Sequence, residues 1–167
     1  MNEVERAQVI RSMFLSRTGQ TLLEAKGVIG ELGQVLSESE LHAFTAMNLF
    51  FLPMYGPAAC GPISRGLPND SRIISIDLTF LRSLGREEMV AIILHELGHL
   101  LHPEAHGLDA DFLADSFAIE KGYAMWVISS LQKIEKGFPH HANPDGSKKR
   151  IEKIRLALES NGSVGAL

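Results

Sequence analysis

The sequence has few of the features that would place it in several large protein classes. Its 167 residues include one cysteine, Cys60, so the chain forms no internal disulfide and no cysteine-based zinc cage. A single thiol suits a reducing compartment, and we expect a cytoplasmic protein. The formal net charge is −4, so no basic excess favours a nucleic acid partner.

Long apolar runs are also missing. The N-terminus is acidic and lacks the basic and apolar regions of a signal peptide. The densest apolar run, 49–55, is far shorter than the ~20 residues of a membrane-spanning helix, so we expect no transmembrane segment. We interpret this run as part of a core helix followed by a loop. The alternative is a surface that contacts a partner or a membrane.

The residues that are present predict one globular domain. Hydrophobic residues make up 45% of the chain and charged residues 22%, as in ordinary soluble domains. One β-branched run predicts a strand at 72–78. Apolar periodicity with Ser, Gly and Pro boundaries predicts helices at 1–17, 21–36, 37–51, 86–102, 109–121, 123–136 and 148–159. The helix at 21–36 is weaker and is interrupted by Gly27, Gly30 and Gly33. We therefore expect an α+β fold that is mostly α, with a helical N-terminal part (1–60) and a core (61–160) within a single domain, 1–167.

The pattern His-Glu-Leu-Gly-His at 95–99 indicates a metal site. Residues four apart lie on one face of a helix about 5–6 Å from each other, so the imidazoles of His95 and His99 can bind the same ion. Glu96 lies beside them and is predicted to act as a general base on a water molecule, not as a ligand. The rest of this helix is apolar, where unpaired polar groups are costly. One zinc ion would satisfy all three side chains.

A catalytic zinc needs a third protein ligand and an open position for water. His102 lies about 10 Å from His95 along the helix axis, which is too far for a shared ion. Asp111 and Asp115 are four residues apart on the next helix. We predict that Asp111 binds the metal and that Asp115 accepts a hydrogen bond from a ligand histidine. Asp109 is the rival ligand, and the remaining alternative leaves both Asp109 and Asp111 solvated at the start of a helix.

The segment Asp-Phe-Leu-Ala-Asp-Ser-Phe-Ala at 111–118 resembles the second zinc helix of gluzincin metallopeptidases of the CAAX prenyl protease and HtpX-like family. That helix carries Glu-x-x-Ala-Asp, and Asp111 stands in the position of its glutamate. The resemblance covers about 72–156. It includes Arg150-Ile151 after Asn143-Pro144, which is similar to a His-Pro…Arg-Ile segment of the family with Asn143 in the histidine position.

This resemblance implies a small zincin-like metallopeptidase core that contains Zn²⁺ and hydrolyses peptide or protein substrates. An aspartate is one methylene shorter than a glutamate. The helix that carries Asp111 must therefore approach the His95–His99 helix more closely than it does in the family.

Two alternative functions remain open at the level of sequence. One is a regulatory metalloprotease that cleaves a single partner protein, such as a repressor. The other is a zinc-binding interaction module without turnover, which would need the histidines but not Glu96. Cys60 as a thiolate that blocks zinc, and Tyr123, His140 or His141 as donors to a transition state, are less favoured interpretations. We interpret the basic segment 148–155 as a solvated face.

Overall fold

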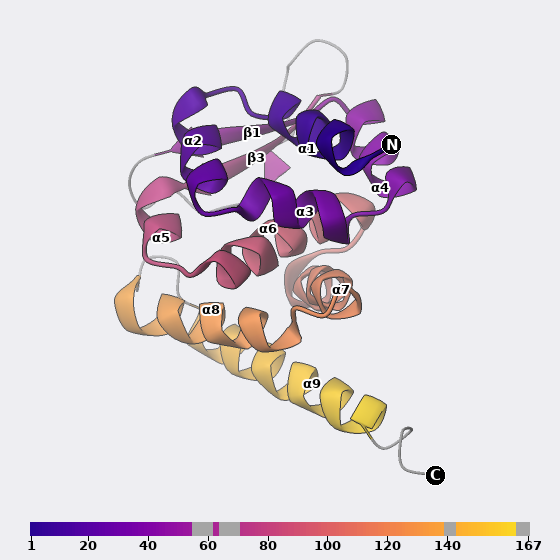
Figure 1. Cartoon of the computed structure of the whole chain (residues 1–167). Coiled ribbons are helices and arrows are strands. Elements are labelled where there is room, and N and C mark those ends of the chain that lie inside the picture. Colours follow the sequence, from indigo (N-terminus) through magenta and orange to yellow (C-terminus); the bar gives the residue numbers. More distant parts are fainter. Residues whose placement is uncertain (55–61, 64–70, 139–142, 163–167) are drawn as a thin grey trace. The chain divides into compact units, whose positions relative to one another are not determined.

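The computed structural model describes residues 1–54, 62–63, 71–138 and 143–162 (Figure 1). These residues form mainly helices, together with one small sheet, so the prediction of an α+β fold that is mostly α is confirmed. The chain divides into two compact units, Met1–Val90 and Ala91–Leu167. Helix α6, Arg86–Leu101, begins in the first unit and continues into the second.

Four helices begin the first unit: α1 Glu3–Ser12, α2 Arg17–Ala25, α3 Val28–Val35 and α4 Glu38–Ala46. The side chains of Asn2 and Ser37 each accept a hydrogen bond from a backbone N–H in the first turn of α1 and α4, in capping boxes. Of the three glycines expected to interrupt the helix over 21–36, only Gly27 does so, since α3 continues through Gly30 and Gly33. Gly27 has a φ of 74°, a left-handed conformation that glycine adopts without strain, and this residue separates α2 from α3.

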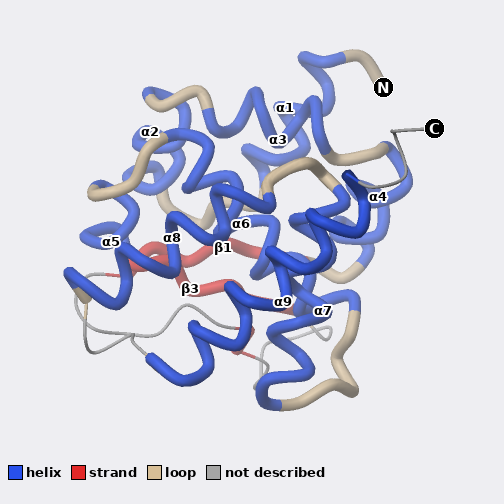
Figure 2. Tube along the Cα trace, turned by 90° about the horizontal axis from the view of Figure 1, so that it is seen from below, coloured by secondary structure: helices blue, strands red, loops and turns tan. Residues whose placement is uncertain are grey.

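The sheet of the first unit has three strands in the order β1-β3-β2 (Figure 2). They are β1 Leu49–Met54, β2 Pro62–Ile63 and β3 Arg72–Asp77. Strands β1 and β3 are parallel, with Leu49 opposite Arg72, and β2 is antiparallel to β3. The predicted strand at 72–78 is confirmed except at its end. There the Asp77 carboxylate accepts two backbone hydrogen bonds and caps the short helix α5, Leu78–Arg82.

Strand β1 corrects the prediction of a helix over 37–51. Helix α4 ends at Ala46, and Asn48 has a φ of 48°, from which a helix does not continue. The Leu-Phe-Phe-Leu run that follows is rich in residues that favour strands. Because β1 lies at an edge of the sheet, it also tolerates Pro53.

The apolar run at 49–55 contributes to the core of the first unit. Leu49 and Phe51 are buried, and the ring of Phe51 stacks on that of Phe14 with centroids 4.8 Å apart. Phe50 and Leu52, which alternate with them along the strand, are half-buried, so a partner or membrane contact through 49–55 stays a prediction. Among the described residues, none of the helices combines the length and apolarity that a membrane crossing requires.

The second unit contains the rest of α6 and three further helices, α7 Gly107–Glu120, α8 Ala124–Gly137 and α9 Pro144–Gly162. Helices α7, α8 and α9 each contact the other two, and α8 and α9 run side by side (Figure 1). Helix α9 begins earlier than predicted. Asn143, and not Ser147, caps it, because the backbone N–H of Gly146 donates to Asn143 Oδ1 at 3.1 Å and proline suits the first helical position.

Candidate metal centre

Helix α6 carries the His-Glu-Leu-Gly-His pattern on a largely buried stretch. His95 and Glu96 are buried, as are the apolar residues that surround them along the helix, Ala91, Ile93, Leu94, Leu97 and Leu100. The side chain of His99 is 17% exposed. Two imidazoles and a carboxylate are therefore held where apolar side chains dominate, so their polar atoms need partners close at hand.

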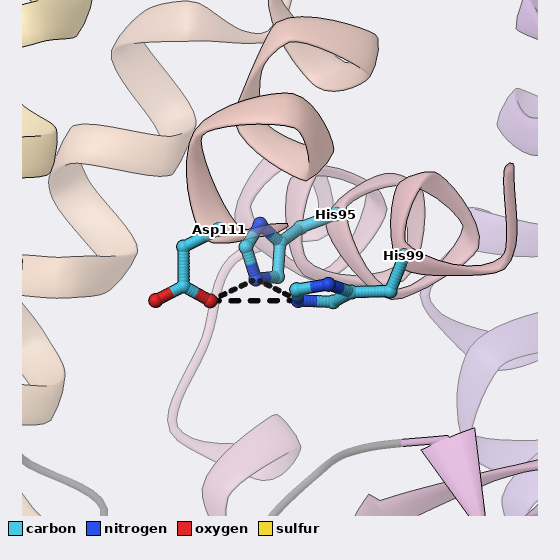
Figure 3. Close-up of side chains that lie close together, drawn as sticks. All are labelled: His95, His99 and Asp111. Carbon is cyan, nitrogen blue, oxygen red and sulfur yellow. Dashed lines mark hydrogen bonds and ion pairs between the residues drawn. The ribbon is translucent and has the colours of Figure 1, made fainter. Parts of the chain in front are cut away.

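Three side chains from two helices converge at this point (Figure 3). The Nε2 atoms of His95 and His99 lie 3.1 Å apart, and Asp111 Oδ1 lies 4.0 Å from the first and 3.5 Å from the second. The two rings meet edge to face, with an interplanar angle of 83°. His95, His99 and Asp111 thus form a group whose ligand atoms can hold one metal ion.

The separations within this group fit a small tetrahedral ion. Zinc bonds of about 2.1 Å at tetrahedral angles place neighbouring ligand atoms about 3.4 Å apart. The three observed separations, 3.1, 3.5 and 4.0 Å, bracket that value. The side chains of His99 and Asp111 are 17% and 31% exposed, whereas that of His95 is 7% exposed. The open side of the site is therefore the side of His99 and Asp111.

The helices that carry these ligands approach closely at Gly98. A Cβ added to Gly98 would lie 2.7 Å from Ala114 Cα and 2.9 Å from the Ala114 carbonyl oxygen, both of which are backbone atoms of α7. No larger residue fits at position 98 without a shift of one helix. This approach matches the requirement for a short aspartate ligand, because it brings the first turns of α7 within reach of His95 and His99.

Asp115 lies on the buried side of the site, next to the ligand histidine. Its Oδ1 atom is 2.9 Å from His95 Nδ1. An ionised carboxylate can only accept, so His95 Nδ1 donates this hydrogen bond, and the lone pair of His95 Nε2 points toward His99 and Asp111. Such an outer acceptor is the usual partner of a metal-bound histidine. Burial alone would raise the pKa of Asp115, but the hydrogen bonds from His95 and Arg150 together lower it.

Arg150 corrects the interpretation of 148–155 as a solvated face. Lys148, Lys149 and Lys153 are exposed, but the Arg150 side chain is only 13% exposed. Its Nε donates to Asp115 Oδ2 at 2.8 Å and its Nη2 donates to Asp115 Oδ1 at 2.7 Å. Sequence reasoning placed Arg150 in the basic segment and in a resemblance, and missed this contact. The neighbouring Ile151 and Ile154, the latter buried, indicated only that this helix has an inward face.

Glu96 has the least satisfied polar atom of the site. Its Oε2 atom is buried and has no hydrogen-bond partner in the described part of the protein. Burial raises the pKa of the Glu96 carboxyl, against the smaller opposing influence of His95 and Arg150. Burial likewise lowers the pKa of His99 to about 4, with the neighbouring His95 as the second cause, so the His99 imidazole is neutral and available to a metal at pH 7.

The other residues that the sequence suggested lie away from the cluster or outside the described residues. Asp109 is exposed in the first turn of α7 and is not part of the His95–His99–Asp111 group. The imidazole of His102 is 3.9 Å from Glu104 and 39% exposed. Tyr123 is buried at the start of α8. Cys60, His140 and His141 are outside the described residues.

Comparison of this chain with protein-family models, with curated proteins and with solved structures finds no match. The site must therefore be interpreted from its own residues.

A prediction follows from the close approach at Gly98. Gly98→Ala places a methyl group against the backbone of α7, so α7 must move outward and Asp111 must leave the two histidines. We expect metal affinity, measured by competition with a chelating dye, to fall strongly in Gly98→Ala. Gly137→Ala is the matched control, because a Cβ at this helical position of the same unit meets no atom within 4 Å. Equal affinity in Gly98→Ala and wild type would contradict the argument.

A second prediction concerns the pH dependence of the metal-free protein. The pKa of His99 is about 4 in the folded state, against the ordinary 6.5 of a histidine in an unfolded chain, so the unfolded chain binds the His99 proton first as pH falls. The contribution of His99 to stability is therefore complete above pH 6.5 and is lost as pH falls toward 4. NMR titration should place the His99 midpoint near 4, and a midpoint near 6.5 would show that the ring is solvated.

Proposed function

We propose that this protein is a zinc-dependent endopeptidase of the His-Glu-x-x-His type, with His95, His99 and Asp111 as metal ligands and Glu96 as the general base. The observation that carries the proposal is the group of three convergent ligand atoms together with the orphaned Glu96 Oε2 atom, which belongs to the residue that follows His95 on the same helix. A buried carboxylate oxygen without a partner is costly in a folded protein. A water molecule on a metal ion in this site would satisfy it.

The donor set favours zinc among the common metal ions. Two imidazole nitrogens and one carboxylate oxygen suit zinc, whereas magnesium and calcium prefer all-oxygen sites. Three protein ligands also leave a fourth position for water or substrate, which is the arrangement of catalytic zinc sites. The partial exposure of His99 and Asp111 agrees with access from that side.

In the proposed reaction, the protein's own groups handle the proton. A bound zinc ion supplies Lewis acidity, which acidifies a water molecule and polarises the scissile carbonyl group. Glu96 accepts a proton from the attacking water and then donates it to the leaving amine, so the peptide bond breaks to a carboxylic acid and an amine. Asp115 holds the Nδ1–H of His95, which keeps the Nε2 lone pair directed into the site.

The proposal includes a zincin-like core of the gluzincin kind, on the strength of the segment 111–118 and of the order of the two site helices. Asp111 and Asp115 lie one helical turn apart on α7, with one near the ligand cluster and the other against His95. The proposed substrates are peptides or proteins. A regulatory protease with one protein substrate would use the same chemistry, and a binding module without turnover would have no use for Glu96.

The ligand assignment predicts different effects for two nearby aspartates. Purified protein should contain close to one zinc ion per chain. We expect Asp111→Ala to abolish stoichiometric zinc, because its Oδ1 is the third convergent atom. Asp109→Ala is the matched control, two residues away on the exposed face, and should retain zinc. If Asp109→Ala loses zinc and Asp111→Ala retains it, the ligand register is wrong.

The catalytic role of Glu96 predicts a separation of binding from turnover. Glu96→Gln keeps the size of the side chain but replaces the proton acceptor with an amide, so we expect full zinc content and loss of peptide hydrolysis. The assay compares wild type and variant on an unfolded protein and a peptide library, with zinc measured on the same samples.

Equal hydrolysis by wild type and Glu96→Gln would remove Glu96 from the mechanism. Wild-type protein that binds zinc but neither cleaves any substrate nor binds a hydroxamate would favour the binding module, because a closed structural site has no position for an added ligand.

A further inference from the structure

Arg150 reaches the metal centre from a helix that supplies no ligand. It lies on α9, 35 residues after Asp115 and 55 residues after His95. Its guanidinium group binds both oxygens of the Asp115 carboxylate, at 2.8 and 2.7 Å. The exposed fractions of the two side chains are 13% and 3%, so this ion pair is shielded from water. It therefore differs from a surface ion pair, which contributes little.

The paired contact fixes the orientation of Asp115. A planar guanidinium that donates to both oxygens holds a carboxylate in one plane, which a single contact does not. Asp115 Oδ1 then accepts from both Arg150 Nη2 and His95 Nδ1, at 2.7 and 2.9 Å. Arg150 Nη2 and His95 Nδ1 lie 3.2 Å apart, and since both are donors, the carboxylate oxygen between them is what holds them together. The plane of Asp115 thus sets the direction of the His95 ring.

Removal of Arg150 would leave Asp115 without the cation that compensates its burial. The Asp115 side chain is 3% exposed, and its carboxylate is satisfied by two hydrogen bonds from Arg150 and one from His95. A buried carboxylate that loses its cation is costly and turns toward water, so its hold on His95 weakens. Arg150 Nη2 also lies 3.4 Å from His95 Nε2, so its positive charge acts directly on the candidate ligand atom, whereas its effect on the orientation of His95 passes through Asp115.

We propose that Arg150 is a positioning residue of the metal centre, which holds Asp115 and through it His95, and that this chain of contacts couples the docking of α9 to metal binding. The inference rests on the proposed zinc site but not on peptide hydrolysis. By linkage, if docked α9 strengthens zinc binding, then zinc binding must stabilise docked α9 by the same factor.

The direction in which zinc affinity changes when Arg150 is replaced distinguishes a positioning role from simple charge repulsion. Arg150 carries a positive charge near a cation site, so a purely electrostatic role would make zinc bind more tightly once that charge is removed. A positioning role predicts the opposite. In Arg150→Met we expect zinc affinity, measured by chelator competition on the full chain, to fall by about 10–100-fold, the usual loss for an outer partner of a ligand. Tighter or unchanged zinc binding would overturn the proposal.

Three further variants test the route of the effect. Lys149→Met removes the same charge from the exposed neighbour on α9 and should leave zinc affinity unchanged. Arg150→Lys keeps the charge but not the paired contact, and should restore only part of the affinity. In an Asp115→Asn background, Arg150→Met should have little further effect, because Arg150 acts through Asp115. Additive losses in the double variant would overturn the proposed route.

Hydrogen exchange tests the coupling to α9. In wild type, added zinc should slow exchange of the α9 amides, and in Arg150→Met this protection should be lost while that of α6 and α7 persists. Zinc that leaves α9 exchange unchanged in wild type would contradict the coupling. To separate an effect on folding from an effect on the site, the circular dichroism and thermal melting of Arg150→Met without metal are compared with those of Arg150→Lys, which keeps the charge and serves as the second test variant.

A metal-free measurement keeps this inference distinct from the proposed function. NMR of the His95 ring should show a proton on Nδ1 in wild type and a mixture of tautomers in Arg150→Met. Wild type that binds no zinc would refute the proposed function, yet this tautomer shift would still support the contact chain. No tautomer shift together with normal zinc binding would refute the positioning role alone.

Discussion

The metal centre depends on the distance at which two helix backbones can pass each other. Gly98 faces Ala114 so closely that a single added carbon would meet the backbone of α7 at 2.7 Å. At this close contact, Asp111 Oδ1 lies 4.0 Å from His95 Nε2 and 3.5 Å from His99 Nε2, although the aspartate side chain is short. The same glycine stands between Glu96 and His99, so the residue type that permits the approach lies within the segment that supplies the chemistry. The close packing of α6 on α7 and the presence of a short aspartate at position 111 therefore depend on each other in this protein.

The polar groups of the site form two sets, one in which donors and acceptors are paired and one that contains acceptors without donors. On the inner side, donors and acceptors match, since Asp115 accepts from both His95 and Arg150. On the other side, the Nε2 lone pair of His95 and the Asp111 carboxylate converge as acceptors, and Glu96 Oε2 is a further acceptor without a partner among the described residues. Acceptors that face one another are stabilised by a cation. The matched set holds the geometry, and the unmatched set is the part of the site that could hold a metal ion.

The sequence predicted those parts of the fold and site that depend on short-range spacing. His95 and His99, and likewise Asp111 and Asp115, are four residues apart on helices whose limits the capping and stop residues marked to within a few positions. The sequence also predicted that α6 and α7 meet at one point, because a catalytic zinc site needs a third protein ligand besides the two histidines. Of the small sheet, only strand β3 was predicted, because its run of β-branched residues clearly favours a strand.

The errors in prediction have equally specific causes. Strand β1 was assigned to a helix because its apolar run lacks alternation, and its partner β3 lies more than twenty residues away, beyond the reach of local patterns. Arg150 was assigned to a solvated face because neighbouring lysines hide it in a charged segment. Its role depends on how α9 packs on α7, which is a tertiary contact that helical periodicity does not encode. Gly30 and Gly33 were expected to interrupt a helix as Gly27 does, but only Gly27 has a positive φ, and the other two lie within α3.

The order in which the site's residues occur along the chain has a consequence for how the protein folds. The two ligand helices follow each other directly, and His95 and Asp115 are separated by only 20 residues. Contacts of such low sequence separation close small loops and form early. Arg150 arrives 35 residues after Asp115, so its contact closes a longer loop. During synthesis from the N-terminus, the ligand hairpin emerges before the helix that steadies it. In a nascent chain, His95, His99 and Asp111 can therefore come together while α9 is still being made. Completion of α9 then fixes the geometry of the site.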